Sequence, residues 1–236
     1  MIYSQKGAYM LEHVYQRFRG GCMMLFSRDG EEASFLGTAF LVHEEGYLLT
    51  AAHLIRRRTD LMVEPLESSA EQFVPVQHET VRPMSVGVVS KDMERDLALL
   101  KFKDTIDISA PDHILGWASE APVGTPLACL SYPFGYQGLH NLVIMRATLA
   151  SKIKSPKENR LLLFDTMVHD GSRGAPLVNL QDGRVIGVVC GRFHPADVTG
   201  GGTEDKESSF ETTNISLAVA MGYGRALLEA EGLVST

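Results

Sequence analysis

A histidine, an aspartate and a glycine-rich turn lie far apart in the sequence and share the residue types of nucleophilic catalysis. His53 follows Thr-Ala-Ala, Asp96 precedes Leu-Ala-Leu-Leu, and residues 171–176 read Gly-Ser-Arg-Gly-Ala-Pro. In nucleophilic acyl transfer, an imidazole activates a hydroxyl that is too weak a nucleophile at its own pKa, and a buried carboxylate orients that imidazole. A histidine after Thr-Ala-Ala, taken alone, is more often a core or turn residue than a catalyst. The chemical interpretation therefore depends on the pattern around it.

That pattern resembles the trypsin-like, chymotrypsin-fold serine proteases, and within them the HtrA/DegP type. The matching segments are Gly37–His53, Arg95–Phe102, Leu130–Gly135, Asn179–Val189 and Ile215–Ala220. The resemblance runs from about Ala33 onward, with no PDZ-like domain after it. It implies an all-β fold of two antiparallel β-barrels with a peptide-binding cleft between them, and it implies serine endopeptidase chemistry in an active member.

The resemblance also assigns roles to two residues. His53 matches the general base, and Asp96 matches the carboxylate that orients it. Asp92 and Glu94 are the rival carboxylates, and a solvated loop is the alternative interpretation of both. Backbone N–H groups of Gly171 and of the residue at position 173 would form the oxyanion hole.

The nucleophile is where the sequence departs from the family, and two registers are open. Without a gap, residues 171–176 overlay the family pattern Gly-x-Ser-Gly-small-Pro, and Arg173 stands where the attacking serine belongs. With one residue inserted, Ser172 becomes the nucleophile, but the tight turn must absorb about 3.8 Å of chain. We favour the ungapped register. A guanidinium stays protonated and has no lone pair to offer, so Arg173 cannot replace serine.

Three functions follow from these registers. The favoured one is a catalytically impaired pseudoprotease that binds a peptide or protein in the cleft. The second is an active serine endopeptidase that uses Ser172, His53 and Asp96. The third is an active protease into which a disabling substitution has introduced arginine at position 173.

Other residues match the substrate side of the cleft. Val189, Cys190, Gly191 and Arg192 resemble the strand that pairs with a bound peptide, and Met167 matches the base of the specificity pocket. An apolar pocket base argues against a preference for basic side chains. A packed strand thiol is the alternative interpretation of Cys190.

Composition limits the remaining classes. The chain has 236 residues, 44% of them hydrophobic, enough for a sizeable core. Its 22 Lys and Arg against 29 Asp and Glu give a net charge of −7, which argues against nucleic-acid or anionic-membrane partners. The eight histidines show no metal-ligand spacing, so we expect no metal and no cofactor. Three scattered cysteines and the lack of a secretory signal or apolar span favour a cytoplasmic protein; the oligomeric state stays open.

Periodicity predicts a short helix over 9–18, a helix from Gly224 that Gly232 ends, and many short strands between them. The expected strands are 22–27, 34–42, 47–50, 60–64, 85–90, 97–102, 126–131, 142–151, 161–166, 175–180, 184–190 and 215–219. We expect one domain over 1–236, with an N-terminal barrel at about 20–110, a C-terminal barrel at about 111–220 and a helix at 221–232. Long loops are expected around 154–160 and 195–214, and an acid of the second could pair with Arg173.

Overall fold

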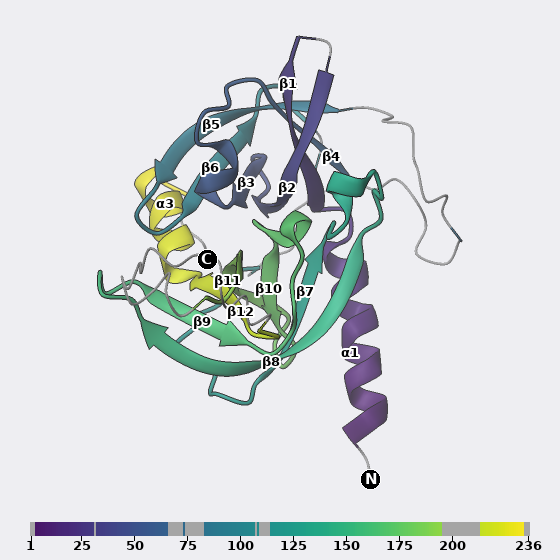
Figure 1. Cartoon of the computed structure of the whole chain (residues 1–236), viewed down its shortest axis with the longest axis vertical. Helices are drawn as coiled ribbons and strands as arrows, with labels where there is room; N and C mark the ends of the chain where they lie inside the picture. The colour runs from purple at the N-terminus through teal and green to yellow at the C-terminus, as the bar shows by residue number, and fades with distance from the viewer. Residues whose placement is uncertain are drawn as a thin grey trace, which may run out of the picture.

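Two closed antiparallel barrels, one after the other along the chain, make up the protein (Figure 1). The computed structural model describes residues 3–30, 32–65, 73, 83–106, 108, 114–194 and 213–233, and for residues 3–10 the backbone only. The first barrel has the strand order β1-β2-β3-β6-β5-β4. Its strands are β1 (Cys22–Asp29), β2 (Glu32–His43), β3 (Tyr47–Thr50), β4 (Leu61–Pro65), β5 (Met84–Asp92) and β6 (Leu97–Phe102).

The second barrel repeats this topology, because its order read from β7 is β7-β8-β9-β12-β11-β10. Its strands are β7 (Pro126–Ser131), β8 (Val143–Lys154), β9 (Arg160–Phe164), β10 (Pro176–Asn179), β11 (Arg184–Arg192) and β12 (Ser216–Ala220). The all-β prediction of two barrels is confirmed, and the fold is a duplication with no visible sequence repeat.

Several strands are buried on both faces, which explains their continuous apolar runs. Along β1, Met23 and Leu25 pack inside the first barrel, whereas Cys22, Met24 and Phe26 join a cluster that also holds side chains of the second barrel. Successive side chains of a strand point to opposite faces, so each such strand serves two cores. The shared cluster fixes the barrels against each other.

One helix lies near each end of the described chain. α1 (Tyr3–Phe18) contacts β7 and β8 of the second barrel before the chain enters the first, and it buries Val14 and Phe18. It begins earlier than the predicted residue 9. α3 (Gly222–Ala230) packs against β6 and β12, and Gly232, with a φ of +77°, follows its end as expected.

Three short 3-10 helices lie in the connections: η1 (Ala52–Ile55), η2 (Gly135–Gln137) and η3 (Asp170–Ser172). The predicted long loop at 154–160 is instead a tight turn between β8 and β9, closed by the Ser155 N–H bond to the Asn159 carbonyl at 2.9 Å. Residues 195–212, and with them the acids predicted to pair with Arg173, lie outside the described residues.

In the part of the chain that the structure describes, no helix combines the length and the apolar character needed to cross a membrane.

The two barrels approach closely at Gly174. Its φ is +84°, and a β-carbon there would lie 2.1 Å from the Thr38 carbonyl oxygen and 2.4 Å from Thr50 Oγ1. Gly174→Ala should therefore lower the free energy of unfolding by at least about 3 kcal/mol, since it adds a backbone clash to the left-handed conformation.

The control for this prediction is Gly138→Ala. Gly138 also has a positive φ, +75°, but nothing lies within 4 Å of a β-carbon built there. We expect this control to cost about 1 kcal/mol, as strain alone would. Urea denaturation measures both variants, and equal losses would contradict the close approach.

Candidate functional site

His53 and Asp96 meet at the edge of the first barrel. η1 places His53 directly after β3, and the connection from β5 to β6 ends in Asp96. The Nδ1 atom of His53 lies 2.7 Å from Oδ2 of Asp96, and the His53 backbone N–H donates to Oδ1 at 2.8 Å. One carboxylate thus fixes both the ring and the main chain of the histidine, which is the arrangement that an orienting carboxylate needs.

Asp96 is held in an unusual backbone conformation. Its φ is +56°, and it is one of two non-glycine residues with positive φ in the described part of the chain. Such residues are enriched at functional sites, because they persist only where surrounding contacts determine them. The Asp96 carbonyl accepts the Ala52 N–H at 3.2 Å, so the backbone also ties the two loops together.

Of the two rival carboxylates, Asp92 is engaged elsewhere and Glu94 is exposed. Asp92 pairs with Arg95 at 2.7 Å and accepts backbone N–H groups of Glu94 and Arg95. Partial burial acts to raise the pKa of Asp92, but the hydrogen bonds and charge of Arg95 outweigh it and hold the pKa below its usual value. Asp92 therefore stabilises the turn before Asp96.

The turn over residues 170–174 is fixed by its main chain. The Arg173 carbonyl accepts the Thr38 N–H at 2.9 Å, and the Gly171 carbonyl accepts the Thr38 hydroxyl at 2.8 Å. Gly171 packs so closely that a β-carbon would lie 2.1 Å from the Tyr132 carbonyl oxygen. None of these contacts uses the side chain at position 173.

The Arg173 side chain lies against Gly191 of β11, the strand that the sequence analysis expects to pair with a bound peptide. Its Nη2 atom pairs with Oδ1 of Asp170 at 2.9 Å, and its Nε lies 3.4 Å from where a β-carbon on Gly191 would stand. Sequence reasoning looked for this partner in the acidic 195–214 loop. Asp170 was missed because it precedes the motif, although the spacing i, i+3 within one turn is a usable signal.

One predicted oxyanion-hole donor is engaged. The Arg173 N–H donates to the Asp170 carbonyl at 3.3 Å within the turn formed by η3. Use of this donor for an oxyanion requires that bond to break, and one missing donor lowers turnover by about 10² to 10³ in serine proteases. The turn as it stands therefore does not present the Arg173 amide to a substrate.

Ser172 faces the protein interior. Its side chain is fully buried, and its Oγ lies 2.9 Å from Oγ of Ser131 in β7. A nucleophile must reach both an imidazole and a substrate carbonyl. Ser172 instead joins η3 to the second barrel through Ser131. The sequence analysis missed this role of Ser172, and it did not single out Ser131 or Thr38.

The residues expected on the substrate side differ in whether they are accessible to a peptide. Val189 is fully buried, and its backbone bonds to Gly174 and Ala175, so it supports the turn rather than offering an edge to a peptide. Met167 is exposed, while Arg192 is half-buried with its Nε donating to the Val168 carbonyl at 3.1 Å.

Cys190 is a poor nucleophile. Burial, with a smaller contribution from the Asp96 charge, raises the pKa of its thiol well above the usual value. The reactive thiolate is therefore scarce at neutral pH. The three cysteines of the chain are all free thiols.

No group of three or more His, Cys, Asp or Glu side chains within the described residues is arranged to hold a metal ion. His78 and His113 lie outside that part of the chain.

Comparison with known proteins agrees with this geometry. A family model described as a trypsin-like peptidase domain matches residues 37–188. Among curated relatives, a probable periplasmic serine endoprotease DegP-like protein of Halomonas elongata is 27% identical over 198 residues, and the serine protease HTR4 of Bos taurus is 32% identical over 176. They match 80% and 73% of this chain, which spans 37% and 33% of their lengths, about a third of each relative.

Solved structures share the fold. The HtrA-type protease AlgW with decapeptide superposes with a TM-score of 0.69 at 18% identity, over 93% of this chain and 66% of that one. The same protease with tripeptide gives a TM-score of 0.69 at 19% identity, over 95% and 65%.

The structural role of Ser172 can be tested with a double-mutant cycle. Ser172→Ala and Ser131→Ala should each lower the free energy of unfolding by about 1 to 2 kcal/mol, because each leaves a buried hydroxyl with a lost partner. The double variant should lose less than the sum by about 1 kcal/mol. Urea denaturation of the parent and three variants measures the coupling.

Ser27→Ala is the control for this cycle. Ser27 is also buried, but within the described residues its hydroxyl has no hydrogen-bond partner. Its removal should be neutral or stabilising. A Ser172→Ala variant that behaves like this control would contradict the buried hydroxyl pair.

Proposed function

Because the chain belongs to the trypsin-like peptidase domain family, we propose that it is a catalytically impaired member that binds an extended peptide in the cleft between its barrels. The observation that carries the proposal is the turn at residues 170–174. Thr38 binds the main chain of that turn, and in the ungapped register of the sequence Arg173 stands where the family pattern has the attacking serine. Loss of a triad nucleophile typically lowers turnover by about 10⁶.

The burial of Ser172 supports this register over the shifted one. A fully buried hydroxyl that pairs with Ser131 has no access to a substrate carbonyl. The His53–Asp96 pair remains in place, so the site keeps a base and its orienting carboxylate but presents no hydroxyl to activate. Peptide recognition can persist without that hydroxyl.

The chemistry of the cleft indicates the class of peptide. Met167 gives an apolar surface at the predicted specificity pocket. Arg173, paired with Asp170, lies against Gly191 on the strand expected to align the peptide. We infer an extended segment with an apolar side chain, which displaces the Arg173 side chain from Gly191 as it binds.

Serine-directed labelling tests the catalytic part of the proposal. The parent should show no covalent reaction with a fluorophosphonate probe, whereas Arg173→Ser should react slowly, because His53 and Asp96 are already paired. The reaction should be slow because the amide at position 173 must first leave the Asp170 carbonyl. Intact-protein mass spectrometry measures the added mass.

Two further variants complete the labelling experiment. Arg173→Ser combined with His53→Ala should lose the reaction, which shows that the base activates the new hydroxyl. Labelling of the parent that disappears in Ser172→Ala would establish the active endopeptidase and overturn the proposal.

Binding of fluorescein-labelled β-casein, an unfolded and apolar-rich chain, tests the peptide part. The parent should bind it without cleavage, and Met167→Asp should weaken binding at least about tenfold by placing a charge against an apolar side chain. Fluorescence polarisation measures affinity, and gel electrophoresis checks that the casein stays intact.

The control is Val123→Asp, which puts the same charge on an exposed apolar residue outside the site. It should bind casein as the parent does. Equal weakening in both variants, or no binding by the parent, would contradict a peptide-binding cleft.

A further inference from the structure

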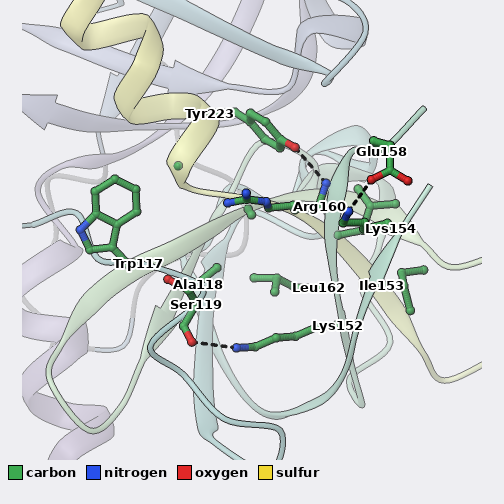
Figure 2. Close-up of a pocket in the computed structure, with 13 residues that line it drawn as sticks. Trp117, Ala118, Ser119, Lys152, Ile153, Lys154, Glu158, Arg160, Leu162 and Tyr223 are labelled. Atoms are coloured by element: carbon green, nitrogen blue, oxygen red, sulfur yellow. Dashed lines mark hydrogen bonds and ion pairs between the residues drawn. The ribbon is translucent and has the colours of Figure 1, made fainter. Parts of the chain in front are cut away.

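A pocket of about 770 Å³ lies on the second barrel, and neither His53 nor Asp96 lines it (Figure 2). Its walls come from the segment Trp117–Ser119, the hairpin of β8 and β9, and the start of α3. Its size falls in the range of small-molecule sites. None of the residues assigned to the cleft lines it.

The pocket combines an apolar floor with aromatic walls. Ile153, Leu161 and Leu162 supply aliphatic surface, and Trp117 and Tyr223 stand on either side. The guanidinium of Arg225 stacks on the Trp117 ring at 4.5 Å and steadies it, yet Trp117 remains 42% exposed. This surface suits an aliphatic or aromatic group.

Positive charge accompanies this surface on a chain whose net charge is −7. Lys152, Lys154 and Arg160 line the pocket with a single acid, Glu158, which pairs with Lys154. The Lys152 amino group donates to the Ser119 carbonyl at 3.3 Å, and no carboxylate among the residues that the structure describes pairs with it. In the described part of the chain no carboxylate pairs with the Arg160 guanidinium, and Figure 2 shows that side chain extending toward Trp117.

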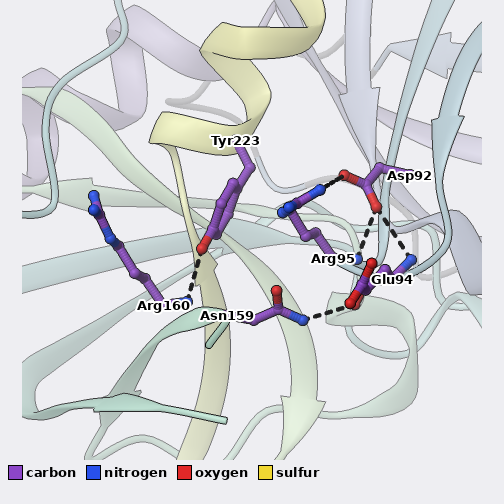
Figure 3. Close-up of polar contacts among 6 residues, drawn as sticks. All are labelled: Asp92, Glu94, Arg95, Asn159, Arg160 and Tyr223. Carbon is purple, nitrogen blue, oxygen red and sulfur yellow. Dashed lines mark hydrogen bonds and ion pairs between the residues drawn. The ribbon is translucent and has the colours of Figure 1, made fainter. Parts of the chain in front are cut away.

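Contacts from the first barrel hold the pocket wall in place (Figure 3). The backbone N–H of Arg160 donates to the Tyr223 hydroxyl at 3.0 Å, and the Arg95 guanidinium lies 4.9 Å from the Tyr223 ring centre. Asn159 donates to the Glu94 carbonyl at 2.9 Å. The wall is therefore formed before a ligand arrives, which lowers the ordering cost of binding.

We propose that this pocket binds a small amphipathic anion, a carboxylate carried on an aliphatic or aromatic body. The body packs against Trp117, Tyr223 and the aliphatic side chains, the carboxylate pairs with the Arg160 guanidinium, and the Lys152 amino group adds positive charge to the same pocket. Charge-assisted bonds of this kind are the stronger class of hydrogen bond, and the planar guanidinium suits a carboxylate.

The sole tryptophan of the chain makes the site directly observable, because Trp117 lines the pocket. Titration of the purified protein with octanoate should change its tryptophan fluorescence saturably, with a dissociation constant of about 1 mM or tighter for a ligand of this size. Octanamide, the neutral analogue with the same chain, should bind at least about fivefold more weakly.

Variants locate the anion. Arg160→Gln and Lys152→Gln should each weaken octanoate binding at least about fivefold, and the backbone bond to Tyr223 survives the first substitution. Arg146→Gln removes the same charge from an exposed position on β8 outside the pocket and should bind as the parent does. Arg173→Ala should also bind octanoate normally, which separates this site from the cleft.

Three results would overturn the proposal: no saturable fluorescence change, equal affinity for octanoate and octanamide, or equal weakening by Arg160→Gln and Arg146→Gln. Circular dichroism checks that each variant is folded. If Arg160→Gln fails to fold, the octanoate affinity of Lys152→Gln compared with that of Arg146→Gln decides whether the proposal stands.

Discussion

The buried side chain and backbone of Thr38 join the two barrels at the site. Its N–H and hydroxyl hold the carbonyls of Arg173 and Gly171, its Oγ1 accepts the Tyr132 N–H at 3.2 Å, and its own carbonyl accepts the Thr50 hydroxyl at 2.7 Å. One residue of β2 thus satisfies groups from the turn, from the segment after β7 and from β3. Buried polar groups must be paired in this way, so the turn cannot shift without leaving several of them unsatisfied.

This constraint makes the fold of the turn independent of the side chain at position 173. The bonds that fix the turn come from main-chain groups, and the glycines at 171 and 174 are required by backbone atoms that lie within 2.1 Å of a β-carbon. The Arg173 side chain is partly exposed, and its ion pair with the exposed Asp170 adds little stability in water. The stability of the fold therefore depends on the main chain of the turn and little on the side chain at position 173.

The sequence predicts the fold well and the fine structure of the site less well. Strands such as Tyr47–Thr50, Leu97–Phe102 and Pro126–Ser131 were predicted with the bounds observed, because glycines, acids and prolines separate their apolar runs. The His53 and Asp96 contact could be expected only from the family resemblance, since 43 residues separate them. The inward turn of Ser172 and the engaged Val189 backbone depend on the hydrogen-bond partners of each peptide group. A sequence motif does not reveal those hydrogen-bond partners.

The segment that carries Asp96 is held by contacts from both barrels. A positive φ at a non-glycine residue costs about 1 to 3 kcal/mol and persists only where neighbours determine it. Its direct partners, His53 and Ala52, belong to the first barrel, but the residues before it are held from the second half of the chain, because Asn159 binds the Glu94 carbonyl and Tyr223 lies against Arg95. Since the same Tyr223 and the β8–β9 hairpin also line the pocket on the second barrel, the segment before Asp96 and that pocket share one set of contacts.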